Sequence, residues 1–76
     1  MSVTYFVVVV FDRDENGEIK AGEAREAANA SAAERHARML SSEHAGTVAF
    51  MQMGDPASGE FEDATMLAQF RRSRSR

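Results

Sequence analysis

The residues with the clearest chemical potential lie between positions 12 and 23, where oxygen-bearing side chains recur at regular intervals. Ca²⁺ takes about six to eight oxygen ligands, and alternate carboxylate or amide side chains around a sharp turn supply several of them. A glycine permits the turn, and a final glutamate closes the shell with two oxygens. The candidate ligands are the side chains of Asp12, Asp14, Asn16 and Glu23 and the main-chain carbonyl of Glu18.

The spacing of these residues resembles the calcium loop of the EF-hand family, with Gly17 at the position of the turn. The resemblance covers residues 12–23 and implies a solitary calcium-binding loop. However, residues 5–11 are β-branched or aromatic, whereas a helix leads into an EF-hand loop. Asn16-Gly17 is also typical of a β-hairpin turn. We therefore expect a turn without a cofactor and keep calcium binding as the first alternative.

The two histidines, His36 and His44, offer little for catalysis. They are eight residues apart, whereas two helical histidines that share a metal ion are typically about four apart. Either histidine paired with a carboxylate could do acid–base chemistry. The sequence contains no nucleophile elbow, phosphate-binding loop or dinucleotide motif. We expect no enzyme, and a small enzyme with a His/carboxylate site is the second alternative.

Charge divides the chain into two parts. Residues 1–70 carry five basic and twelve acidic side chains, so they have a net charge of −7. This acidic body should repel nucleic acid, because phosphate contacts supply most non-specific affinity. Residues 71–76 contain only Arg and Ser and are predicted to be a disordered tail. A solvated terminus is preferred there over an arm that contacts RNA or a membrane.

Composition also constrains the setting of the protein. Its 76 residues make one domain, expected over residues 1–70, and the lack of cysteine excludes disulfides and Cys-based zinc sites. The longest apolar run, residues 5–11, is far shorter than the ~20 residues that span a bilayer. No signal peptide is readable at the N-terminus. We predict a cytoplasmic protein without a membrane partner.

The chain reads as four strands and one helix. Val3–Phe11 and Thr47–Met53 are rich in β-branched and aromatic residues, and Phe61–Phe70 alternates more loosely. Residues 18–26 alternate weakly; a strand is preferred because Asn16-Gly17 needs a partner strand, although the Ala, Glu and Arg residues also suit a helix. The fold class is therefore α+β, a four-stranded and mainly antiparallel sheet with one helix, in the order β-β-α-β-β.

The predicted helix follows Ser31, which forms a capping box with Glu34. Ala33, Ala37, Leu40 and both histidines fall on one face, and Gly46 ends the helix. The buried face is mostly alanine, so this helix of about thirteen residues can lie close to a sheet.

The first strand is apolar on both faces, but one helix covers only one side of a sheet. A large uncovered apolar face is typical of an interface. We therefore predict a homodimer, joined sheet to sheet or edge to edge, unless the strand twists and the C-terminal segment folds over it. The predicted interface residues are Val3, Tyr5, Val7, Val9 and Phe11.

Several short sequence words lie between residues 31 and 70. They include His36-Ala37-Arg38, His44-Ala45-Gly46, Val48-Ala49-Phe50, Gly54-Asp55-Pro56 and Gly59-Glu60-Phe61-Glu62-Asp63-Ala64. With these words the chain resembles small uncharacterised bacterial proteins of about 70 residues. The resemblance implies no activity, so the expected function is a small non-catalytic domain for binding or self-association.

Overall fold

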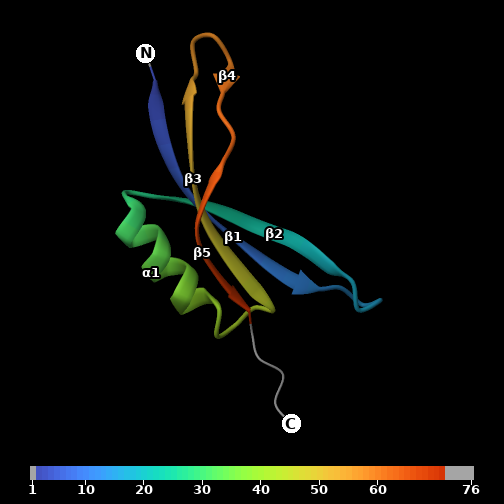
Figure 1. Ribbon diagram of the computed structural model, residues 1–76. Helices are drawn as coiled ribbons and strands as arrows, with labels where there is room; N and C mark the ends of the chain where they lie inside the picture. The colour runs from blue at the N-terminus through green and yellow to red at the C-terminus, as the bar shows by residue number, and fades with distance from the viewer. Residues whose placement is uncertain (1, 72–76) are drawn as a thin grey trace.

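The computed structural model describes residues 2–71, which form a strongly twisted antiparallel sheet with one helix against one face (Figure 1). The predicted α+β class is confirmed. The elements in chain order are β1 (Val3–Arg13), β2 (Ile19–Ala27), α1 (Ala30–Leu40), β3 (Gly46–Asp55), β4 (Glu60–Phe61) and β5 (Thr65–Arg71).

The predicted order of four strands is wrong near the C-terminus, where the single strand expected over residues 61–70 is two strands. Phe61 pairs with Gly54, and pairing resumes where Thr65 meets Met51. From Phe61 to Thr65 the chain advances four residues, whereas the paired stretch of β3, from Gly54 to Met51, covers only three. The extra length falls at acidic residues with low strand propensity, so the ladder is interrupted there.

The open question about residues 18–26 is settled in favour of a strand, because β2 pairs antiparallel with β1. The register shifts near Val10, since Val9 lies opposite Ala24 and Phe11 lies opposite Ala21. One extra residue of β2 is therefore accommodated as a β-bulge around Gly22.

β1 is the central strand, with β2 on one side and β3 on the other. β4 and β5 both pair with β3, at its two ends. Val8 is buried under α1, so alternation along β1 directs its even-numbered residues toward the helix. The odd-numbered residues point to the opposite face.

Two predictions about the helix are wrong. Its N-cap is Asn29, whose Oδ1 accepts the amide of Ala32 at 2.8 Å, and not Ser31. The helix ends at Leu40, where the hydroxyls of Ser41 and Ser42 donate to carbonyls of the last turn. Serine favours such local bonds over a continued helix. His44 therefore lies in the loop that precedes β3.

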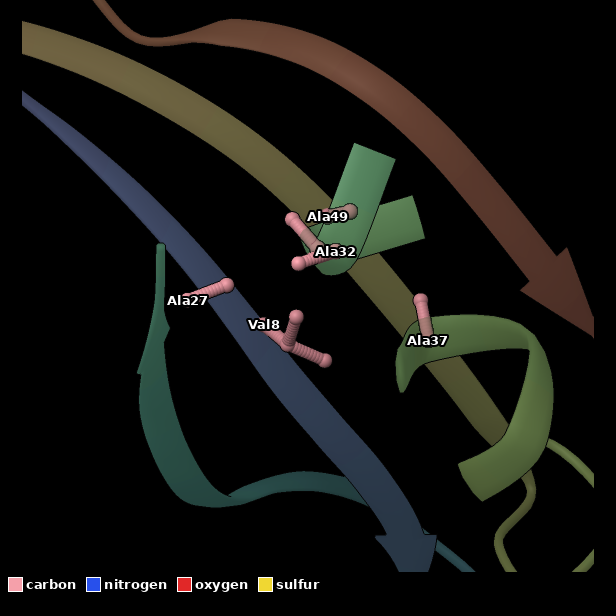
Figure 2. Close-up of a cluster of buried hydrophobic side chains, with 6 residues drawn as sticks. Val8, Ala27, Ala32, Ala37 and Ala49 are labelled. Atoms are coloured by element: carbon pink, nitrogen blue, oxygen red, sulfur yellow. The ribbon is translucent and has the colours of Figure 1, made fainter. Parts of the chain in front are cut away.

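The fully buried centre of the hydrophobic core consists of small side chains (Figure 2). Its buried members are Val8, Ala27, Ala32, Ala33, Ala37 and Ala49. Buried Thr47 adds a polar anchor, because its Oγ1 donates to the carbonyl of Ala37 at 2.7 Å. Larger side chains surround this centre and are partly buried against it: Phe6, Leu40, Leu67 and Phe70.

The C-terminal boundary also differs from the expectation. Arg71 is the last residue of β5 and not the first residue of the tail. The remainder of the predicted tail, residues 72–76, lies outside the described residues. No helix of the described chain is long and apolar enough to cross a membrane.

Candidate functional site

The predicted interface residues occupy one surface. Val3, Tyr5, Val7, Val9 and Phe11 are the odd-numbered residues of β1, and they lie on the sheet face away from α1. None is fully buried, and Val3 retains 40% of its surface. Within residues 2–71, no element lies over this face (Figure 1).

Neighbouring strands enlarge this surface with residues that the sequence had not assigned to it. Val48 and Phe50 of β3 pair with Val9 and Val7, and directly paired residues share a sheet face. Met66 pairs with Phe50, and Phe61 pairs with Gly54. We call the whole set the open face: Val3, Tyr5, Val7, Val9, Phe11, Val48, Phe50, Phe61 and Met66.

A shallow hollow of about 330 Å³ lies at one end of the open face. The Tyr5 and Phe61 rings stand beside it, with centroids 6.2 Å apart. The Phe61 ring also lies directly against Gly54, where a Cβ atom would collide with it. Gln52 adds a polar wall, with its Nε2 donating to the carbonyl of Glu62 at 2.9 Å. The hollow thus has aromatic side chains and the hydrogen-bonded Gln52 amide on one side, and the charged residues Arg25 and Glu26 of β2 also line it.

Asp14 organises the β1–β2 turn with its own carboxylate. Its Oδ1 accepts the backbone amides of Asn16 and Glu18, each at 2.9 Å, and Gly17 takes the positive φ of 81° that the turn requires. The Glu18 amide is the main reason that the pKa of Asp14 lies below its usual value, and the Asn16 amide and nearby Lys20 lower it further. These bonds are those of a hairpin turn.

The remaining calcium candidates are spread out. Asp12 Oδ2 lies 2.7 Å from Nδ1 of His44, and its Oδ1 accepts the amide of Ala45. Glu23 lies along β2, where its Oε1 is 3.3 Å from Arg25. Among residues 2–71, no three His, Asp or Glu side chains are grouped to hold a metal ion. The structure therefore does not bring the predicted ligand set together.

The Asp12–His44 pair is a His/carboxylate contact between distant parts of the chain. His44 borders a cavity of about 20 Å³, lined also by Leu40 and Val8. That volume holds about one water molecule. His36 is exposed on α1. The pair therefore ties the start of the β1–β2 hairpin to the loop before β3.

No protein-family model, curated protein or solved structure matches this chain. The candidate site on the described surface is therefore the open face, with its hollow at the Tyr5 end.

Proposed function

We propose that this chain is a small non-catalytic binding domain that acts by self-association, with the open face as the surface of a homodimer. The observation that carries the proposal is the row of partly exposed valine and aromatic side chains along β1 and β3, on the face opposite α1. Contiguous apolar patches of this kind are rare on monomers and mark interaction sites.

The dimensions of the molecule suit such an interface. It measures 49 × 26 × 16 Å, which corresponds to one sheet and one helix in thickness. A stable interface needs about 800 Å² from each partner, which is less than the outline set by the two longer dimensions of the molecule. Burying one fully exposed valine or phenylalanine contributes about 1.5–3 kcal/mol. The residues of this row are already partly buried, so each contributes less and several must act together.

The strand edges are poorer interfaces than the face. Within the described sheet, β2 forms one edge, and its exposed side chains include Lys20, Glu23 and Arg25. The register of β2 is shifted at its bulge, and β5 has a similar shift opposite Ala49 and Phe50. Bulges and charges are the usual devices that prevent edge-to-edge pairing. These features favour the sheet-to-sheet arrangement.

The test is the molar mass by light scattering, from low to high micromolar concentration. We expect a dimer for the wild type and a monomer for Val9→Lys, because the lysine places a charge at the centre of the contact. Met39→Lys is the matched control, since Met39 is 67% exposed on α1; it should remain dimeric. A wild type that stays monomeric at high micromolar concentration refutes the proposal.

A further inference from the structure

Two charged side chains lie on the open side of the sheet beside the apolar residues. Glu26 pairs with Val7, so it shares the face of Val7. Arg71 pairs with Gly46, which pairs with Phe11, so it lies on the same face. Both are exposed. Arg13 follows Phe11 at this end, but its Nη1 donates to the carbonyl of Gly17 at 2.6 Å.

Glu26 and Arg71 are placed symmetrically about the paired residues Val9 and Val48. Glu26 lies one strand outside β1, at the level of Val7, which is two residues before Val9. Arg71 lies one strand outside β3, at the level of Phe11, which is two residues after Val9. The acid and the base are therefore about equally far from the Val9–Val48 pair, on opposite sides of it.

We infer that the two-fold axis of the homodimer passes over the Val9–Val48 pair and that Glu26 of each copy contacts Arg71 of the other. This inference rests on the proposed self-association through the open face. Because such an interface is isologous, the same ion pair forms twice. A two-fold axis that places Glu26 of one copy over Arg71 of the other makes the strands of one sheet cross those of the other at close to a right angle. Such orthogonal crossing is one of the standard packings of two sheets.

The sizes of the side chains also support the Val9–Val48 pair as the centre of the dimer interface. Val9 and Val48 are smaller than the aromatic residues toward the two ends of the open face, so two copies approach most closely where the valines meet. The two charges then fall outside the apolar centre, and charged residues are typical of the rim of an interface and depleted from its core. Opposite charges at the rim also fix the orientation of the partner.

Charge reversal tests the pairing through the dissociation constant of the dimer, measured by sedimentation equilibrium in low salt. Glu26→Arg and Arg71→Glu should each weaken the homodimer about tenfold or more, because each places like charges together at two contacts. An equimolar mixture of the two variants should form a heterodimer about as tight as the wild type, since both contacts again join opposite charges. Glu34→Arg and Arg35→Glu, exposed on α1, are the matched controls.

The outcomes separate this inference from the proposed function. Recovery in the mixture, with both controls unchanged, supports the Glu26–Arg71 contact. A wild-type dimer that Val9→Lys dissociates but the reversals do not affect overturns the axis and leaves the open face as the interface. A dimer insensitive to Val9→Lys, or a monomeric wild type, overturns both.

Discussion

The hydroxyl of Thr47 is the buried polar contact between the helix and the sheet, and its removal gives a defined stability change. Its Oγ1 donates to the carbonyl of Ala37, and Thr47 has no exposed surface. Thr47→Val keeps the shape and removes only this bond. The Ala37 carbonyl still accepts the amide of Ser41 at 3.0 Å, so it is not left without a partner.

The expected loss is therefore that of one net hydrogen bond, about 0.5–1.5 kcal/mol, without a further penalty for an unsatisfied carbonyl. For a domain of this size, each kcal/mol lowers Tm by roughly 4–8 °C. Thermal and urea unfolding are measured at one fixed protein concentration, because self-association makes stability depend on concentration.

Thr47→Ser is the matched control, since it loses a methyl group but keeps the hydroxyl. It should retain the ¹³C shift of the hydrogen-bonded Ala37 carbonyl, whereas Thr47→Val should move it. A valine variant as stable as the wild type, with the Ala37 shift unchanged, refutes the anchoring role of the hydroxyl.

Three further predictions concern the hollow and the turn. Gly54→Ala should displace the Phe61 ring from Tyr5, because the added Cβ collides with that ring, and the near-ultraviolet circular dichroism of tyrosine should decrease; an unchanged spectrum contradicts the packing. Millimolar Ca²⁺ should leave the ¹⁵N–¹H peaks of residues 12–23 in place, because the Asp14 carboxylate is already bonded to backbone amides; saturable shifts there support the calcium alternative. The pKa of Asp14 is lowered in the folded protein, so its ionised carboxylate stabilises the folded state. This stabilisation is complete above the ordinary pKa of 3.8 and is lost as pH falls through the lower folded pKa. Asp14→Asn should flatten that acid limb in pH-dependent unfolding, and an unchanged acid limb contradicts the role of the turn carboxylate.

Local composition was sufficient to predict the main strands, a single helix and the apolar odd-numbered face of β1. Residues 3–11 have strong strand propensity on both faces, and this signal requires no knowledge of distant residues. Val48 and Phe50 are two residues apart, so the alternation of a strand places them on one face. Which face of β1 they join depends on register, which the sequence pattern leaves free.

The incorrect predictions arose where two local signals compete. Asn29 and Ser31 are both good N-caps, and the Ser31–Glu34 pattern favoured the wrong one. Gly46 is a plausible helix end, but Ser41 and Ser42 end the helix earlier. The Asp12–His44 contact joins residues 32 positions apart, so no local pattern indicates it.

The alanine core determines how the chain should respond to random mutation. A core of large side chains is damaged mainly by truncation, which leaves cavities. Here Ala33, Ala37 and Ala49 have no exposed surface, and their side chains can lose only a methyl group. Damage must instead come from enlargement, which forces the helix away from the sheet. A saturation library should therefore show these positions restricted to the smallest residues, whereas Met39 and Met66, which are 67% and 58% exposed, should accept a wider range.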